Sequence, residues 1–161
     1  MKQINGLCGV QAITAAFAAA RAERRAALIT YLMAGYPSLD ESVNLARALQ
    51  AGGADLIELG IPFSDPMADG PTIQRAGYAA LEAGVAPRDC INLAATLRRQ
   101  GVTLPLLLMG YYNPILSYSP AAFAQDAAVA GVDGLIVPDL PPEEAEPLHG
   151  ACARAGLALV Y

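Results

Sequence analysis

The chain has 161 residues, of which 55% are hydrophobic and 16% charged, a profile typical of a compact globular domain rather than a disordered or fibrous chain. Fifteen acidic against ten basic side chains give a net charge of −5, and no lysine or arginine cluster is interleaved with aromatic residues. Both features argue against nucleic acid as a partner.

Cysteine and histidine are too few and too scattered to suggest a metal site. Cys8, Cys90 and Cys152 form no CxxC pair, and His149 is the only histidine, so neither a zinc site nor a disulfide framework is expected. We expect Cys90 and Cys152 to pack on helices and His149 to lie on a solvated helical face. Scattered thiols are typical of the reducing cytoplasm.

The first segment predicts an amphipathic helix at about 10–25. Val10, Ile13 and Phe17 fall at helical spacing ahead of several charged residues, a pattern that favours a helix over a secretory signal. No apolar run approaches the roughly 20 residues that a membrane helix needs. We therefore expect a soluble, cytoplasmic protein.

Short apolar runs rich in β-formers then alternate with segments of helical periodicity. We predict strands at 27–35, 54–62, 104–112, 133–139 and 157–161, and helices at 38–53, 71–84, 87–101, 119–131 and 141–156. Near-continuous apolar strands alternating with helices indicate an α/β protein with a parallel sheet. A doubly wound sheet and a (β/α)8 barrel both fit this pattern.

Length separates the two architectures in one respect. A complete (β/α)8 barrel needs about 250 residues. As a barrel, the sequence is therefore a single incomplete domain over residues 1–161, truncated after its fifth strand, with unpaired edges at the first and last strands.

The stretch ELGIPFSDPMADGP (58–71) places an acid where the second apolar run ends. Side chains alternate along a strand, so Ile57 and Leu59 share one face and Glu58 lies on the other. If Ile57 and Leu59 pack against outer helices, Glu58 points into the interior, where lost hydration raises its pKa. Such an acid can both donate and accept a proton near neutral pH.

A second carboxylate, Asp69, lies in the loop that follows. The loop can return Asp69 over the mouth of the sheet, where we expect solvation to keep it ionised. Two carboxylates in different environments can divide acid/base and electrostatic roles. The alternative is that Glu58 is a buried carboxylate paired with an arginine, and that Asp65 and Asp69 are ordinary turn residues.

Four segments carry a resemblance to a known family: YLMAGYP (31–37), ADLIELGIPFSDPMADGPTIQRA (54–76), LLLMGYYNP (106–114) and GVDGLIVPDLPPEE (131–144). In this order they closely resemble the tryptophan synthase alpha chain family, over about residues 10–161. The resemblance implies a (β/α)8 barrel of the TIM-barrel class with an extra N-terminal helix. It also implies a lyase that cleaves indole-3-glycerol phosphate to indole and glyceraldehyde 3-phosphate in tryptophan biosynthesis.

The resemblance implies specific roles. The residue matching Glu58 moves protons at indole C3 and at the glycerol side chain, and the residue matching Asp69 stabilises positive charge at the indole nitrogen. Tyr31, Met109 and Tyr111 would line the indole pocket, although each also fits ordinary strand core. No metal or organic cofactor is implied for this chain.

A partner is implied as well. Pro62, Asp65, Asn113 and Pro141 match surfaces that meet the tryptophan synthase beta chain, which holds the pyridoxal phosphate of an alpha-beta heterotetramer. A non-catalytic module that activates a beta chain is the alternative function. An aldolase that forms an imine is disfavoured, because the only lysine is Lys2.

The sequence departs from the family pattern at three places. Thr30 and Met33 replace the proline and threonine more usual on the first strand, and everything after the fifth strand is absent. In the family, the absent part holds the substrate phosphate on glycine-rich loops and a helix N-terminus. Family membership therefore does not by itself imply that these 161 residues are active.

Overall fold

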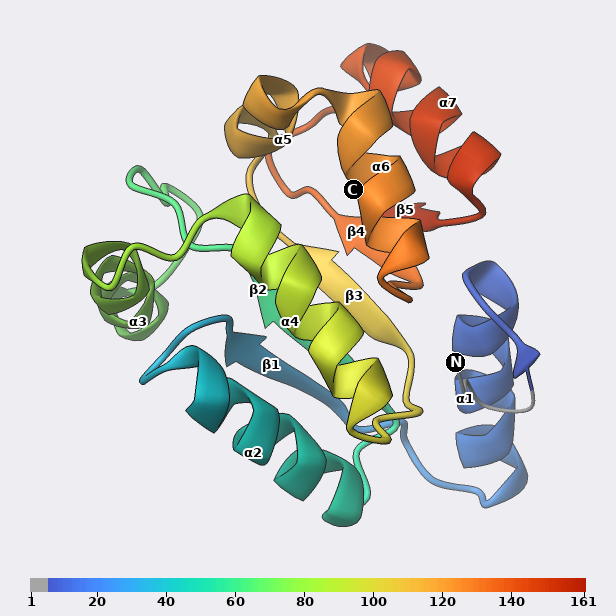
Figure 1. Ribbon diagram of the computed structural model, residues 1–161. Coiled ribbons are helices and arrows are strands. Elements are labelled where there is room, and N and C mark those ends of the chain that lie inside the picture. Colours follow the sequence, from blue (N-terminus) through green and yellow to red (C-terminus); the bar gives the residue numbers. More distant parts are fainter. Residues whose placement is uncertain (1–5) are drawn as a thin grey trace.

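The sheet contains five parallel strands in sequential order. The computed structural model describes residues 6–161, and Lys2 lies outside the described residues. The strand order is β1-β2-β3-β4-β5, so strands that follow one another along the chain lie side by side (Figure 1). Their bounds are β1 Ile29–Met33, β2 Leu56–Gly60, β3 Leu106–Met109, β4 Gly134–Ile136 and β5 Ala158–Val160. A doubly wound sheet would reverse its order at a switch point, so this order favours the barrel architecture.

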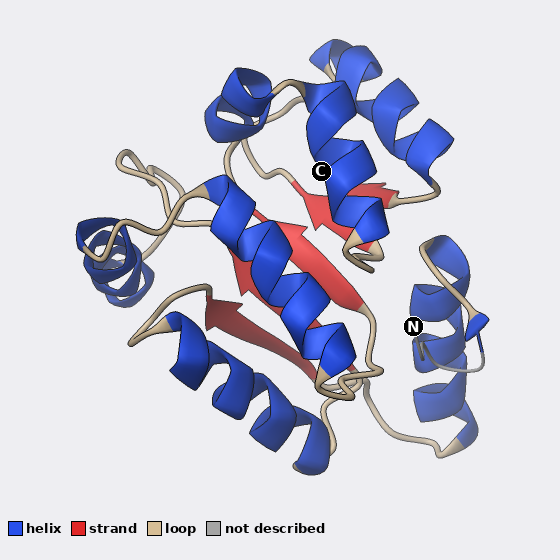
Figure 2. Ribbon diagram, viewed as in Figure 1, coloured by secondary structure: helices blue, strands red, loops and turns tan. Residues whose placement is uncertain are grey.

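Helices surround the sheet (Figure 2). They are α1 Val10–Ala22, α2 Leu39–Ala51, α3 Pro71–Glu82, α4 Pro87–Arg99, α5 Tyr112–Tyr118, α6 Pro120–Val129, the 3-10 helix η2 Pro142–Glu144 and α7 Glu146–Ala155. Helices α2, α4 and α6 cover one face, whereas α1 lies beside the ends at which the strands begin (Figure 1). Among the described residues, no helix is long and apolar enough to cross a membrane.

The start of α5 differs from the expectation of a strand at 104–112. The strand ends at Met109, and α5 begins at Tyr112. The Tyr112 amide donates a 2.9 Å hydrogen bond to the Asp139 carboxylate, which satisfies one of the free N–H groups at the helix start. This contact between distant residues is not visible in the local sequence pattern.

The predicted helix 141–156 is also divided. Residues Pro142–Glu144 form a 3-10 turn, and the α-helix begins only at Glu146. Proline lacks an N–H group and is tolerated in a first helical turn but not inside a helix. Pro147 therefore requires a new helix start just before it.

The core lies between the sheet and its covering helices. Ile57, Leu59, Leu106, Leu108 and Leu135 are each at most 1% exposed, and they pack in one cluster with apolar helix residues such as Phe123, Leu97 and Leu148. The strand residues that alternate with them face the other side of the sheet. The outer helices thus bury alternate side chains of the central strands β2 and β3 and Leu135 of β4.

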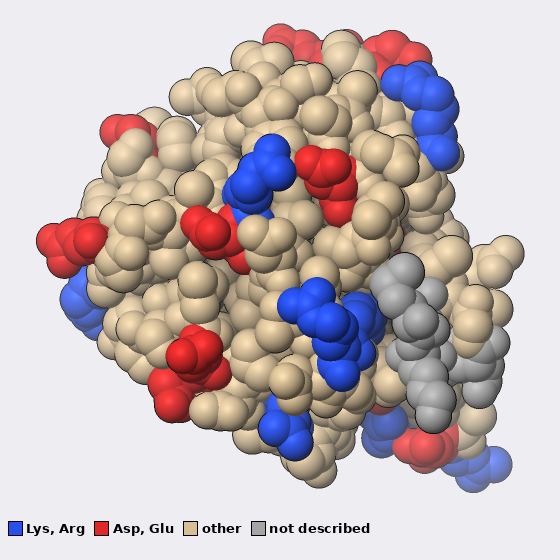
Figure 3. All heavy atoms as spheres, in the orientation of Figure 1, with Lys and Arg blue, Asp and Glu red and all other residues tan. Residues whose placement is uncertain are grey.

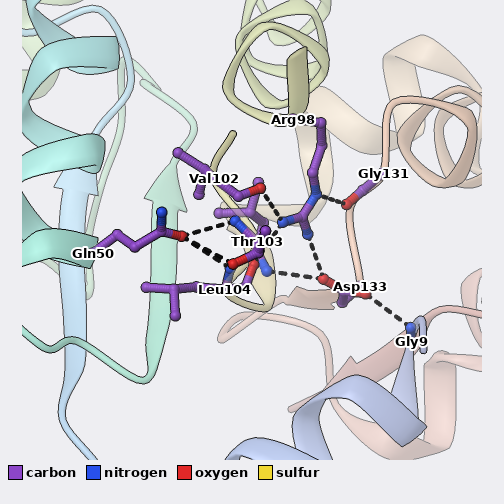
Figure 4. A network of polar contacts seen from close by, with 9 residues as sticks. Gly9, Gln50, Arg98, Val102, Thr103, Leu104, Gly131 and Asp133 are labelled. Atoms are coloured by element: carbon purple, nitrogen blue, oxygen red, sulfur yellow. Dashed lines mark hydrogen bonds and ion pairs between the residues drawn. The ribbon is translucent and has the colours of Figure 1, made fainter. Parts of the chain in front are cut away.

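A buried carboxylate ties four segments together (Figure 4). Asp133, immediately before β4, accepts hydrogen bonds from Gly9 N at 2.9 Å, Leu106 N at 3.0 Å and the Arg98 guanidinium at 2.7 Å. Arg98 is buried with it. Its remaining N–H groups donate to the carbonyls of Gly131, Val102 and Leu104. Because the charges are paired and hydrogen-bonded, this network connects the start of α1, α4, β3 and β4 without an unsatisfied buried group.

The Asp133 contact requires glycine at position 9. Gly9 has φ +58°, a conformation that side chains rarely adopt, and a Cβ there would overlap the carbonyl of Gly156. The backbone of α1 can therefore approach β4 and β5 closely enough for its first amide to reach the carboxylate.

We predict that Arg98→Met lowers the free energy of unfolding by about 3–5 kcal/mol, because it leaves Asp133 charged and unpaired in the core. Urea unfolding followed by circular dichroism measures this loss. Glu23→Ala is the matched control, since Glu23 pairs with Arg25 at an exposed site and such pairs contribute little. Equal unfolding midpoints for Arg98→Met and the unaltered chain would contradict the prediction.

Candidate active site

Glu58 points into the interior, as the alternation along β2 predicts. Its neighbours Ile57 and Leu59 are fully buried in the helix-covered core. Glu58 is half-buried and lines a cavity on the opposite face of the sheet. The expectation of an inward carboxylate is therefore confirmed.

The cavity beside Glu58 has a volume of about 270 Å³ and a mostly apolar wall. Helix α1 and all five strands contribute to it, with Val10, Ile13, Thr14, Phe17, Ile29, Leu56, Leu107, Ile136, Ala158 and Val160. Glu58 is the one titratable side chain in this lining. Loss of hydration raises the pKa of Glu58 above its ordinary value, because an apolar wall disfavours the charged form.

Asp69 lies in the loop between β2 and α3 and is also half-buried. Burial raises its pKa, and a hydrogen bond with the Tyr111 hydroxyl acts in the opposite direction. The expectation that solvation of the loop favours the ionised form of Asp69 is therefore wrong, because burial disfavours that form. The group that favours the charged form is the Tyr111 phenol.

Tyr31 lies beside both acids. In the parallel register, Tyr31 of β1 is opposite Glu58 of β2. Burial raises the pKa of the Tyr31 hydroxyl, and the charges of Asp69 and Glu58 raise it further. Because both carboxylates act on one hydroxyl, the structure brings Glu58 and the loop that carries Asp69 to the same region.

Glycine at position 60 makes room for this phenol. Gly60 follows Glu58 on the same face of β2, and a Cβ there would overlap the Tyr31 hydroxyl and its ring. The hydroxyl has one hydrogen-bond partner among the described residues, the Met33 sulfur at 3.9 Å, a weak acceptor.

Met109 and Tyr111 complete the neighbourhood. Met109 pairs with Gly60 on one side and with Ile136 on the other, and it is half-buried. The buried Tyr111 packs against Phe63 with ring centroids 5.2 Å apart. Of the three pocket residues predicted from the sequence, Tyr31 lies in the middle of β1, Met109 at the carboxyl end of β3 and Tyr111 just beyond it. None of them is among the residues that line the cavity beside Glu58. Ile136 was not predicted, although strand alternation places it on the same face as the cavity.

The four residues predicted to meet a partner do not share one environment. Asp65, Asn113 and Pro141 are exposed, whereas Pro62 is buried within the chain. Pro62 therefore packs inside rather than presenting a surface. On the face seen in Figure 3, acidic and basic side chains are interspersed among uncharged residues.

The structure also bears on the alternative for Glu58. The buried arginine, Arg98, pairs with Asp133, and within residues 6–161 no ion pair involves Glu58. Cys90 and Cys152 are buried helix residues, as expected. His149 is exposed on α7, with its Nδ1 atom 3.0 Å from the Tyr161 hydroxyl.

Parallel strands in sequential order with covering helices define part of a (β/α)8 barrel. The family described as "Tryptophan synthase alpha chain" matches residues 17–161. The chain belongs to the tryptophan synthase alpha chain family.

Individual relatives agree with this assignment. The chain is 57% identical to the tryptophan synthase alpha chain of Roseiflexus castenholzii, over 90% of this chain and 56% of that protein. It is 49% identical to the tryptophan synthase of Saccharomyces cerevisiae, over 89% of this chain and 20% of that protein. The crystal structure of the alpha subunit from Legionella pneumophila superposes with a TM-score of 0.88 at 42% identity, over 92% of this chain and 56% of that one. The chain thus spans little more than half the length of the alpha chains it matches.

We predict that Gly60→Ala destabilises the chain by about 1–3 kcal/mol, because the added Cβ forces the Tyr31 ring out of its site. Gly70→Ala is the control, since a Cβ at Gly70 meets nothing within 4 Å. Chemical unfolding of the two variants measures the difference. The space assigned to Gly60 would be wrong if both variants unfolded at the same denaturant concentration.

Glu58 should make stability depend on pH in a defined direction. Its raised pKa means that the folded chain favours the protonated acid, so the cost of charging Glu58 is absent at about pH 4 and present in full at pH 7. Glu58→Gln should therefore raise the melting temperature at pH 7 and leave it unchanged at about pH 4.

Melting curves at the two pH values measure this effect, with Glu82→Gln as the control because Glu82 is exposed on α3. A Glu58→Gln variant that melts below the unaltered chain at pH 7 would contradict the assigned environment of Glu58.

Proposed function

We propose that this chain acts in the retro-aldol cleavage of indole-3-glycerol phosphate to indole and glyceraldehyde 3-phosphate, the alpha reaction of tryptophan biosynthesis. Family membership supports the reaction class. The observation that carries the proposal is the inward Glu58 carboxyl, with a pKa raised by desolvation and with Tyr31 opposite it on the neighbouring strand. The full substrate and product remain part of the proposal, because the relatives are much longer than this chain.

The proposed chemistry needs one group that both donates and accepts a proton. Glu58 in its protonated form transfers a proton to indole C3, which gives an iminium-like ring. Glu58 then takes the proton of the side-chain hydroxyl next to C3 as the C–C bond breaks. The bond electrons return to the ring, so indole and an aldehyde leave, and the proton count balances. A carboxyl with a raised pKa suits both steps near neutral pH.

Asp69 is proposed to supply the electrostatic part. A negative charge next to the ring nitrogen stabilises the positive charge that develops there after protonation of C3. The Tyr111 hydroxyl supports this role, because its hydrogen bond favours the ionised form of Asp69. Burial raises the pKa of both carboxyls, and only Asp69 has a neighbouring hydroxyl that acts in the opposite direction.

We further propose a tryptophan synthase beta chain as the partner and the cytoplasm as the location. The proposed reaction moves protons and one electron pair, so it needs no metal or organic cofactor on this chain, and pyridoxal phosphate belongs to the beta chain. The exposed Asp65, Asn113 and Pro141 are the proposed contact residues. Buried Pro62 would act only by shaping the loop that carries Asp65.

We predict that Glu58→Gln lowers kcat for indole formation by about 10²–10⁴-fold, since the amide cannot transfer a proton. Asp69→Asn should lower kcat by about 10²–10³-fold through the lost charge. The assay follows indole release from indole-3-glycerol phosphate by the full product of the gene that encodes this chain, with Glu82→Gln as the control.

The same assay separates the two functions. A Glu58→Gln variant that releases indole at the normal rate would overturn the catalytic proposal. If that variant still stimulated a beta chain as well as the unaltered protein does, the non-catalytic module would be the better account.

A further inference from the structure

The turn that presents Asp69 is held by a side chain from the following helix. Residues Pro66–Asp69 form a turn in which the Asp69 amide donates to the Pro66 carbonyl at 3.1 Å. The side-chain amide of Gln74, in the first turns of α3, donates to the Asp69 carbonyl at 2.9 Å and to the Pro66 carbonyl at 3.4 Å. One half-buried side chain thus holds both ends of the turn.

The opposite side of the turn is held from the segment between β3 and α5. The amide of Ala68 donates a 2.8 Å hydrogen bond to the Tyr111 hydroxyl. The turn's own side chains contribute little to this anchoring, because Met67 is 94% exposed and Ala68 is exposed as well. The position of the Asp69 backbone therefore depends on Gln74 from one element and on Tyr111 from another.

Steric contacts at the next residue, Gly70, do not restrict the chain. Gly70 has an ordinary φ of −76°, and a Cβ there would meet nothing within 4 Å. Pro62 and Pro66 come before the turn's last two residues, and Pro71 begins α3 two residues after Asp69. Without the Gln74 side chain, the Asp69 carbonyl would lose a hydrogen bond that anchors the segment between Pro66 and the first residue of α3.

We propose that Gln74 is a positioning residue, whose side-chain amide fixes the backbone of Asp69 so that the Asp69 carboxylate stays beside the Tyr111 hydroxyl. The inference rests on the proposed function in one respect, namely that Asp69 acts in the reaction. The chemistry explains the residue type. An amide donates two N–H groups to two carbonyls, whereas a carboxylate of the same shape has no N–H donor and repels both oxygens.

The first test measures the titration of Asp69 in the whole chain without substrate, by NMR of the side-chain carboxyl carbons. In Gln74→Glu and in Gln74→Met, the Asp69 carboxylate should relax into water. Its pKa should then fall toward the ordinary value of a solvated aspartate, because the burial that raises it is lost. The pKa of Glu58 should stay unchanged, because Glu58 lies on β2 and takes no part in the hydrogen bonds that Gln74 and Tyr111 make with the turn.

Tyr78→Phe is the matched control. It removes the 3.3 Å hydrogen bond from the Tyr78 hydroxyl to the Ser64 carbonyl, which links the same helix to the same loop ahead of the turn. This variant should leave the Asp69 titration unchanged. An unaltered Asp69 titration in both Gln74 variants would overturn the proposal, and two variants of different charge guard against an effect of the new carboxylate itself.

A second test separates this inference from the proposed function. In the indole-release assay, Gln74→Met should lower kcat about tenfold or more with little change in KM, but it should cost almost nothing further when Asp69 is already asparagine. Additive losses would overturn the positioning role. A normal rate for Asp69→Asn alone would instead refute the proposed function. The NMR titration would still decide whether Gln74 positions Asp69, because it does not depend on the reaction.

Discussion

The alternation of side chains along β2 is the constraint on which the candidate site depends. Ile57 and Leu59 are fully buried against the outer helices, so the residue between them has to face the interior. A shift of one residue would put the Glu58 carboxylate into the helix-covered core and expose two large apolar side chains to the cavity. The packing that fixes the register of β2 in the sheet thus also determines that Glu58 faces the interior.

Two carboxylates illustrate how environment decides between structure and chemistry. Asp133 is completely buried, yet two backbone amides and Arg98 satisfy it, so its charge serves to join distant segments. Glu58 is less buried but faces an apolar wall and has no ion pair among residues 6–161. The first arrangement stabilises a charge, whereas the second keeps a proton exchangeable, which is what an acid/base group needs.

Local patterns in the sequence were enough for the fold class, the N-terminal helix and the direction of Glu58, because each depends on periodicity within one element. They were not enough for contacts between distant elements. The Asp139 carboxylate accepts a hydrogen bond from the first amide of α5, 27 residues earlier in the chain. Arg98 pairs with Asp133, 35 residues later. The choice between a barrel and a doubly wound sheet likewise required the strand order. No local signal marks Gly60 as space for Tyr31, since that need arises only when β1 lies beside β2.

The turn at Pro66–Asp69 is anchored through main-chain amides and carbonyls, while its outermost side chain, Met67, faces water. The side chain at position 67 therefore takes no part in holding the Asp69 backbone. A substitution at position 67 can therefore change the outer surface of the turn while the hydrogen bonds that hold the Asp69 backbone stay in place.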